Sequence, residues 1–436
     1  MHIFYAKFLG WLFFGQCADL SLDSRSGARH FFTMDTQSYE IAIVGAGMVG
    51  LSLALGLADA GVSVALIERA TLSDMAVASF DGRGSAVAAG SQRILEGLAL
   101  WEGLAEEAEP ILEIRVSDGK SPLFLHYDHN EIGDGPLGWV IENAVIRRAL
   151  AGKAKHSCLK VYDGTGVAHC SFGEEAAVLD LTGGKSISAR LVVAADGRES
   201  PLRETAGIDS VSWRYPQTGI VCAVKHEVPH NGIAHEHFLP AGPFAILPMT
   251  KNRSSIVWTE RNDLTPNILA LDDDAFAAEI GERFGDFLGE IEIGPKRWSY
   301  QLSGIHSKSY IAPRLALAGD SAHAIHPIAG QGLNIGLRDV AALAEVIMDS
   351  LRIGLDPGSM TTLERYERWR KPDNMMMIGV TDVLNRLFSN DIPPIRVARD
   401  IGLAAVGRTT PLKKIFMRHA MGMVGDLPRL TRGEPL

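Results

Sequence analysis

Cysteine is scarce in this sequence, and the few cysteines are not arranged as ligands. The 436 residues contain four cysteines, with no CxxC pair among them: Cys17, Cys158, Cys170 and Cys222. Paired cysteine spacings mark structural zinc sites, and disulfides persist mainly in oxidising compartments. The scattered thiols therefore indicate a reducing compartment and predict neither a disulfide framework nor a structural zinc.

An excess of positive charge and long apolar runs are also missing. The formal net charge is -10, which argues against general nucleic-acid binding. The apolar run at residues 8–14 is about half as long as a membrane-spanning helix requires. The G-x-S-x-G elbow of many hydrolases is absent as well. What remains is the composition of an ordinary globular protein, long enough for one large domain or two interleaved domains.

The first 37 residues differ from the rest of the chain. Lys7 precedes the apolar run, but no small-residue cleavage site follows it. Met34 lies just before the first predicted strand, which begins at Glu40. We interpret residues 1–37 as an extension, either disordered or a mis-assigned start. A weak membrane-associating segment is the alternative.

A glycine-rich turn, GAGMVG at residues 45–50, follows the apolar strand 40–44. An apolar helix comes next, and a second strand, 63–67, ends in an acid. In such a unit the glycines form a tight turn, admit a pyrophosphate and pack helix against strand, while the acid binds ribose hydroxyls. An acid at this place favours FAD or NAD over NADP. The predicted cofactor contacts are Gly45, Gly47, Gly50 and Glu68.

Two later strands end in similar polar turns. The strand LVVAA ends in Asp196-Gly197, and the strand 315–318 ends in Gly319-Asp320. Beyond Asp320, the segment GQG at residues 330–332 opens another helix. A carboxylate at a strand end can accept hydrogen bonds from a ribose or ribityl hydroxyl. Bare amides at a helix start bind a diphosphate.

The run HPIAGQG at residues 326–332, with Asn334, Gly336 and Asp339, resembles the ubiquinone-biosynthesis hydroxylases of the UbiH/UbiF type. These are FAD-dependent, class A aromatic monooxygenases, and the resemblance extends over residues 40–433. It implies further contacts with FAD, carried over position by position. They are Arg83, Asn143, Asp196, Gly197, Asp320, Gly330, Gly332 and Asn334.

The expected fold is α/β, with a Rossmann-like FAD-binding domain built from discontinuous segments, 38–110, 141–205 and 301–374. Segments within residues 206–300 alternate apolar and polar residues, which predicts an antiparallel sheet with one buried face. This sheet and residues 111–140 would form an inserted substrate domain, and residues 375–436 a helical tail. Candidate pocket residues, several of which also fit core positions, are Phe238, Phe244, Leu247, Pro248, Trp258, His326 and Pro327.

A metal site and a side-chain catalyst are not predicted. His323 and His326 lie three residues apart, but no third ligand has metal spacing. A structural or pocket-lining role suits both better. No catalytic acid or base can be identified from the pattern.

The C-terminal tail is locally basic in an acidic protein. Between residues 395 and 424 the only acid is Asp400. The basic residues of this segment are Arg396, Arg399, Arg408, Lys413, Lys414 and Arg418. A basic, apolar-rich segment predicts peripheral contact with an anionic membrane. Helices packed on the cofactor domain with a solvated face are the alternative.

The resemblance implies the chemistry. Reduced flavin would react with O2 to give a C4a-hydroperoxide, which hydroxylates the ring of a polyprenylphenol in ubiquinone biosynthesis. Because a second GxGxxG unit is absent, NAD(P)H or a reduced electron-transfer protein would supply electrons transiently. The expected setting is the cytoplasmic, inner face of the membrane, beside other quinone-biosynthesis proteins. Open alternatives are a hydroxylase of a small soluble phenol, an isoprenoid reductase and a non-catalytic flavoprotein that binds quinone precursors.

Overall fold

The computed structural model describes residues 36–436 except 78–79, 120, 122–123, 134 and 295. Thr36–Leu436 form one compact unit. The predictions for residues 1–35, which include Met34 and Cys17, lie outside the described residues. Cys158, Cys170 and Cys222 are free thiols.

The first sheet is built around parallel strands from distant parts of the chain. Its path runs β18-β19-β11-β1-β2-β8, with the hairpin β9-β10 added beside β11. The strands are β1 Gln37–Val44, β2 Val64–Ile67, β8 Leu159–Tyr162, β9 Val167–Phe172, β10 Ala177–Leu181, β11 Ser186–Ala194, β18 Ile311–Ala312 and β19 Leu315–Leu317. Strands β2 and β19 are wholly buried, as are residues 41–43 of β1 and 191–194 of β11. Such continuous apolar runs are expected in a parallel sheet covered on both faces.

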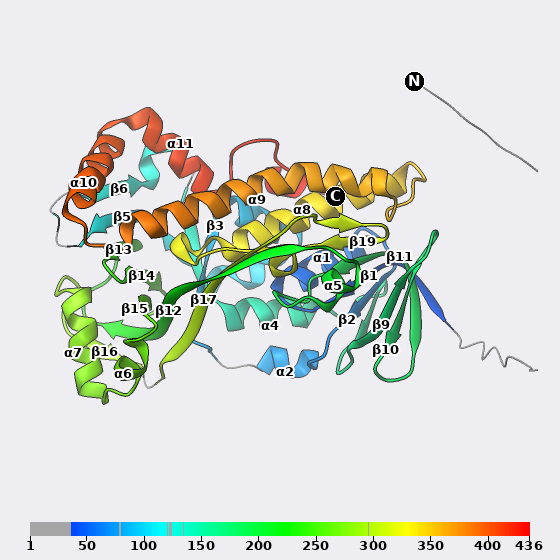
Figure 1. Cartoon of the computed structure of the whole chain (residues 1–436), viewed down its shortest axis with the longest axis horizontal. Coiled ribbons are helices and arrows are strands. Elements are labelled where there is room, and N and C mark those ends of the chain that lie inside the picture. The colour runs from blue at the N-terminus through cyan, green and yellow to red at the C-terminus, as the bar shows by residue number, and fades with distance from the viewer. Residues whose placement is uncertain (1–35, 78–79, 120, 122–123, 134, 295) are drawn as a thin grey trace, which may run out of the picture. The chain divides into compact units, whose positions relative to one another are not determined.

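Helices cover this sheet and include the most buried helix of the fold, α8. They are α1 Met48–Asp59, α2 Leu72–Val77, α3 Ala89–Gly97, α4 Asn143–Lys153, α5 Pro201–Thr205, α8 Gln331–Arg352 and α9 Met360–Phe388. Helix α8 packs against α1, α3 and α9. Figure 1 shows α8 and the longer α9 lying alongside each other. Glycine makes the close contact with α1 possible, since a Cβ on Gly336 would lie 2.6 Å from Val49 Cγ2.

The second sheet is mostly antiparallel and follows the order β20-β17-β12-β15-β14-β13-β5-β6, with β16 beside β12. Its strands are β5 Glu113–Asp118, β6 Phe124–Asp128, β12 Ser210–His226, β13 Ile233–Leu239, β14 Gly242–Met249, β15 Arg253–Arg261, β16 Ile291–Ile293, β17 Trp298–Ser307 and β20 His323–Ala324. The two sheets confirm the predicted α/β class, with an antiparallel sheet inserted into a discontinuous Rossmann-like one. A small third sheet contains β3 Gly84–Ala88, β4 Glu109–Ile111 and β7 Gly138–Glu142.

The two faces of the inserted sheet have different neighbours. On one face Phe244, Trp258 and Ile256 form a core with Phe276 of helix α7 Asp273–Phe284. The short helix α6 Thr265–Leu269 leads into this layer. On the other face Ala234 and Met249 pack in a cluster that includes Ala86 of β3. The second face is therefore the one turned toward the small sheet and the glycine-rich loop.

The C-terminal helices are α10 Pro393–Arg408, α11 Thr410–Ala420 and α12 Arg429–Arg432. Helix α10 contacts β6 and is anchored by Arg399, whose Nε and NH2 donate to Asp118 at 2.7 and 3.1 Å. Arg399 NH1 also donates to the Leu387 carbonyl at the end of α9. The domain boundaries stay predictions, although α9 runs unbroken across the one placed at residues 374–375. Among the helices in the described part of the chain, none has the length and hydropathy needed to cross a bilayer.

Candidate active site

The three polar turns of the sequence meet at one edge of the parallel sheet. Val44 lies opposite both Ile67 and Ala194, and Ala194 lies opposite Leu317. The strands are parallel, so the segments that follow all leave the sheet at its carboxyl edge. Those segments begin at Gly45, Glu68, Ala195 and Ala318. This edge is where open α/β sheets bind their ligands.

Each glycine of the first turn meets a different surrounding. Gly45 has φ +104°, and a Cβ there would lie 2.2 Å from the Ala195 carbonyl oxygen. A Cβ on Gly50 would lie 1.9 Å from the Gly45 carbonyl oxygen. Around Gly47, by contrast, nothing described lies within 4 Å of a Cβ position. Gly47 therefore borders open space directly before α1, whose first turn carries no acid, and this arrangement suits an anionic group.

Glu68 is held beside the same turn. Its Oε2 accepts a 2.6 Å hydrogen bond from the Ala46 amide, and its Oε1 accepts a 3.0 Å bond from the Ala70 amide. These bonds fix the carboxylate next to the glycines. The predicted contact with ribose hydroxyls remains a prediction that this position supports.

The second and third turns are joined by arginines. Arg198 Nε donates to Asp320 Oδ2 at 3.0 Å. Arg203, which is buried, donates to the Ser321 and Arg198 carbonyls at 2.9 and 2.8 Å. Arg203 thus orders the surrounding backbone. Arg198 instead pairs with Asp320, the acid predicted to accept hydrogen bonds from ribose or ribityl hydroxyls.

Asp196 carries a signal that a ligand is expected. Burial raises the pKa of its carboxyl, and its Oδ1 is buried without a hydrogen-bond partner among the residues that the structure describes. Buried polar atoms are normally paired, so an orphaned oxygen beside this edge fits a donor from a bound group. Gly197 follows with φ +92° and has open space at its Cβ position.

Arg83 and Asn143 lie in contact with each other through the backbone. The Asn143 amide donates to the Arg83 carbonyl at 3.1 Å. The Arg83 guanidinium pairs with Asp81 at 2.7 Å and lies 5.0 Å from the centre of the Tyr300 ring. Arg83 is therefore a fixed cation rather than a freely solvated one. The Asn143 side chain accepts from Ser85 Oγ at 2.6 Å, and its role at the diphosphate stays a prediction.

The glycine-rich helix start also leaves space. Gly330 has φ +61°, and a Cβ there would lie 3.0 Å from Ala86 Cβ. At Gly332 nothing described lies within 4 Å of the Cβ position. The Asn334 side chain is occupied, because it accepts from the Ala88 amide at 2.9 Å and donates to the Ala86 carbonyl at 2.8 Å. Among the described groups of this turn, the backbone amides at the start of α8 can face an anion.

The two histidines have different surroundings. His323 Nε2 lies 2.5 Å from Asp339 Oδ2, in a buried pair. His326 Nδ1 accepts from the Ile328 amide at 3.3 Å, and its ring packs edge-on against Tyr215. Burial lowers the pKa of His326 to about 4. A possible ligand group of Glu113, His126 and Asp128 occurs on β5 and β6, away from these turns, and Glu113 is already paired with Arg115.

The pocket candidates divide between the two faces of the inserted sheet. Phe244 and Trp258 pack on the α7 face, so the structure assigns them to a core and not to the face with Leu247. Pro248 alternates with Leu247 and Met249 and so shares the side of Phe244. Phe238 and Ile328 share a cluster on the other face, and Pro327 is exposed. The alternation alone could not tell which face α7 would cover.

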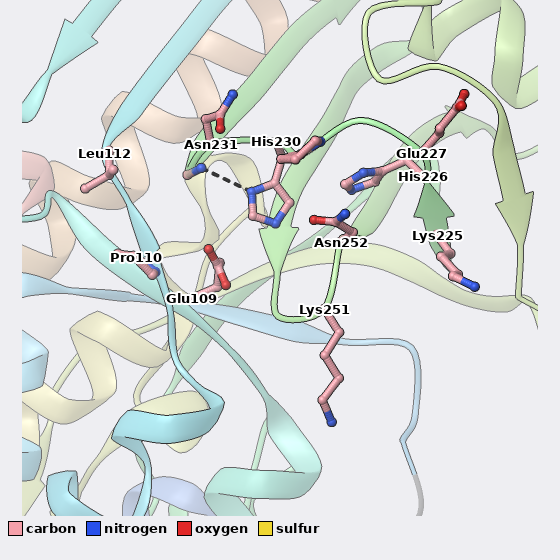
Figure 2. Close-up of a pocket in the computed structure, with 12 residues that line it drawn as sticks. Glu109, Pro110, Leu112, Lys225, His226, Glu227, His230, Asn231, Lys251 and Asn252 are labelled. Carbon is pink, nitrogen blue, oxygen red and sulfur yellow. Dashed lines mark hydrogen bonds between the residues drawn. The ribbon is translucent and has the colours of Figure 1, made fainter.

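An open pocket of about 840 Å³ lies elsewhere, and no motif residue lines it. Figure 2 shows this pocket, with the His230 ring accepting from the Gly232 amide through Nδ1 at 3.1 Å. The other ring nitrogen of His230 is bonded to the Met249 carbonyl. Both ring nitrogens of His230 therefore have backbone partners. The pocket is separate from the three turns, and we assign it no part in the site.

Glu236 of β13 is a residue that sequence reasoning missed. It lies between Ala234 and Phe238 on the face turned toward Ile328. The signal that could have found it is the strand AHEHFLP, in which the acid falls on the apolar side of the alternation.

The chain is similar to known proteins in sequence and in fold. Residues 38–379 match the family model described as "FAD binding domain". A protein of Rhodospirillum rubrum named ubiquinone hydroxylase UbiL is 50% identical over 405 residues, covering 91% of this chain and 93% of its own. The 3-demethoxyubiquinol 3-hydroxylase of Escherichia coli is 35% identical and is covered along its whole length by 89% of this chain. The solved structure of p-nitrophenol 4-monooxygenase PnpA from Pseudomonas putida covers 89% of this chain and 100% of its own, with a TM-score of 0.75 at 19% identity.

Proposed function

This chain belongs to the FAD-dependent hydroxylases of ubiquinone biosynthesis, and from that premise we propose that it hydroxylates the aromatic ring of a polyprenylphenol. The relatives named ubiquinone hydroxylase and 3-demethoxyubiquinol 3-hydroxylase support a quinone precursor as substrate. The convergence of three motif turns at one sheet edge is the observation that carries the assignment. Besides the motifs that the family shares, the chain thus has a sheet edge at which FAD could bind.

The reaction consumes O2 and a pair of electrons. One oxygen atom replaces a ring hydrogen as a hydroxyl, and the other leaves as water with two protons. Bound FAD supplies the redox chemistry, since a reduced flavin activates O2 and side chains cannot. We propose that NAD(P)H or a reduced electron-transfer protein delivers the electrons.

The residues of the chain bind and orient. Backbone amides of Gly45, Gly47 and the first turn of α1 would donate hydrogen bonds to the diphosphate, and Arg83 would offset its negative charge. Glu68 would accept from the adenosine ribose, and Asp320 from the ribityl chain. The orphaned Oδ1 of Asp196 is satisfied once a donor arrives. Backbone amides near Gly332 and Asn334 would face a negatively charged part of FAD at the start of α8.

Apolar side chains between the glycine-rich loop and the C-terminal helices support a prenylated substrate. Ile328 of the loop shares a cluster with Phe238, Phe388 of α9 and Leu403 of α10. These side chains are themselves buried in a packed cluster. A prenyl tail lying beside them would meet apolar walls rather than water, which suits an isoprenoid better than a small polar phenol.

We further propose that the enzyme works at the cytoplasmic face of the membrane, in peripheral contact. Two of the six basic residues of the tail are not available to a membrane. Arg399 and Lys413 are buried, and they are paired with Asp118 and Glu131, respectively. Exposed apolar side chains on α10 and α11 remain, among them Val397, Ile401 and Ile415. Four cations accompany them: Arg396, Arg408, Lys414 and Arg418.

Lipid profiling of a deletion strain tests the proposed function. We expect loss of the gene to deplete the quinone and to accumulate an under-hydroxylated polyprenylphenol, identified by mass spectrometry. The intact gene should restore the pool, whereas a Gly47→Glu variant, whose carboxylate would enter the diphosphate space, should not. An unchanged quinone pool in the deletion strain would overturn the assignment.

A further inference from the structure

Glu236 is a carboxyl without a partner on a mostly apolar face, where the charged groups nearest along the sheet are Asp118 and Arg399, which are paired with each other. In strand β13 its neighbours on the same face are Ala234 and Phe238. Across the sheet it lies opposite Val116 of β5 and Ala245 of β14. Among the residues that the structure describes, none donates a hydrogen bond to this carboxyl or forms an ion pair with it. An acid that is largely shielded from water and has no partner costs stability, so its presence calls for a ligand.

The row that contains Glu236 crosses the inserted sheet on the face turned toward the flavin site. Ala245 lies opposite Val257, and Val257 lies opposite Val221, so the row continues with small apolar side chains. Ala234 on one side belongs to the cluster that includes Ala86, the residue against which Gly330 packs. Phe238 on the other side belongs to the cluster of Ile328. Glu236 therefore lies between two groups of residues that border the glycine-rich loop.

The small side chains beside Glu236 leave it partly accessible. Its exposed fraction is intermediate rather than buried. Even so, the surrounding protein raises the pKa of the carboxyl to about 7. A group that is shielded by protein but still reachable is one that an apolar, ring-bearing ligand can touch. Near neutral pH such a carboxyl exists in both protonation states, as a general base requires.

We propose that Glu236 binds the phenolic hydroxyl of the substrate and acts as the general base that removes its proton. The phenol O–H bond breaks, its electron pair stays on the oxygen, and a new O–H bond forms on the carboxylate. No electrons are exchanged with any other group. The ring becomes more electron-rich, which favours oxygen transfer to it, and the proton returns to the product oxygen afterwards. This inference rests on the proposed function, because it needs a phenol as substrate.

Single-turnover hydroxylation of 2-geranylphenol by the FAD-loaded protein, reduced with dithionite and mixed with O2, tests the proposal. With the wild type we expect the rate of product formation to rise as the pH increases through about 7. In Glu236→Gln this rise should vanish and the rate should fall by about a hundredfold. The matched control is Glu260→Gln, which alters a buried acid on the opposite, α7-side face and should keep the rise.

Two further measurements separate catalysis from structure. The melting temperature of Glu236→Gln at pH about 8 should equal or exceed that of the wild type, because an unpaired and poorly solvated carboxylate is removed. Oxidised wild type should bind 2-geranylphenol more tightly than its methyl ether, and Glu236→Leu should lose this preference. If Glu236→Gln keeps the pH-dependent rise and a rate within about twofold of the wild type, the proposal fails while the function stands. If the wild type forms no hydroxylated product, the proposed function itself fails, and the proposal with it.

Discussion

Asp320 joins two of the three turns of the site. Its carboxylate pairs with Arg198 at 3.0 Å, and both side chains are roughly half exposed. An exposed pair of this kind contributes little to folding stability. Asp320 therefore matters mainly for its position, directly after Gly319 in the turn that follows β19. There it can accept hydrogen bonds from the hydroxyls of a bound flavin chain.

We expect Asp320→Asn to weaken FAD binding more than it weakens the fold. A hydrogen bond to a charged group contributes about 1.5–3 kcal/mol, which corresponds to a Kd raised roughly tenfold to a hundredfold. Quenching of flavin fluorescence during titration of the apoprotein measures the change. Asp263→Asn, at an exposed acid paired with Arg261 on the inserted sheet, is the control and should leave the Kd unaltered. Equal FAD affinity in wild type and Asp320→Asn would contradict the role given to Asp320.

Residues that act through their own backbone were the ones that sequence reasoning could place. Gly45 has a positive φ and lies close to Ala195, so a glycine is required there. The GxGxxG motif shows this requirement in the sequence itself. Glu236 is different, because its meaning depends on which face of a sheet meets the glycine-rich loop. Asn334 was placed in the right turn, but its side chain binds β3, 246 residues away along the chain. Partners at such separations cannot be inferred from a local pattern.

At the scale of elements, a buried charge network joins α8 and α9 to the third turn. Asp339 of α8 accepts from His323 and from the Gly319 amide, while Arg370 and Asn374 of α9 donate to its other oxygen. Burial alone would raise the pKa of Asp339, but His323 and Arg370 hold it well below its usual range. The network fixes the backbone that presents Asp320.

Asp339→Asn should lower the free energy of unfolding by about 3–5 kcal/mol at neutral pH, since Arg370 is left buried without its counter-charge. Because the folded pKa is depressed, the stabilisation by Asp339 is present above pH about 4 and is lost as the pH falls below it. The difference in the free energy of unfolding between the variant and the wild type should therefore become smaller at acidic pH. Urea unfolding at several pH values measures it, with Asp274→Asn on the exposed side of α7 as control. A gap that is absent at neutral pH would contradict this account.

Element boundaries followed from local signals where caps were present. Helix α7 spans Asp273–Phe284, with Asp272 accepting from the Ala275 amide before it and Gly285 at φ +81° after it, and both of these caps are visible in the sequence. Which face of the inserted sheet this helix covers had no such signal, and so Phe244 and Trp258 could be core or pocket until the fold was known. The helix expected from residue 375 proved to be the second half of α9.

Over the whole molecule, α9 connects the cofactor sheet with the inserted sheet. Its first half reaches the third turn through Arg370, and its second half meets β12, where Asn385 donates to Gln217 at 2.9 Å. Its end is closed by Arg399 of α10, the helix that carries the proposed membrane contact. Figure 1 shows α9 spanning the distance between β19 and α10. The proposed membrane contact and the proposed flavin edge thus lie at the two ends of one long helix.

We expect the protein to sediment with vesicles containing phosphatidylglycerol and less with pure phosphatidylcholine vesicles. Val397→Ser with Ile401→Ser should weaken this binding by at least about tenfold, because each buried apolar side chain contributes roughly 1.5–3 kcal/mol. Val211→Ser, at a similarly exposed position on β12, is the control. Protein that stays in the supernatant with anionic vesicles, or that self-associates through these residues instead, would contradict the membrane contact.

The most direct test of the central claim follows the oxygen atom. The FAD-loaded protein, reduced and supplied with 2-geranylphenol, is exposed to O2 labelled with the heavy oxygen isotope, and the product is analysed by mass spectrometry. If the three turns hold a flavin that hydroxylates the ring, the product carries one labelled oxygen, and the Asp320→Asn protein forms less of it at limiting FAD. A product whose new oxygen is unlabelled, or no product from a fully flavin-loaded protein, would contradict the account.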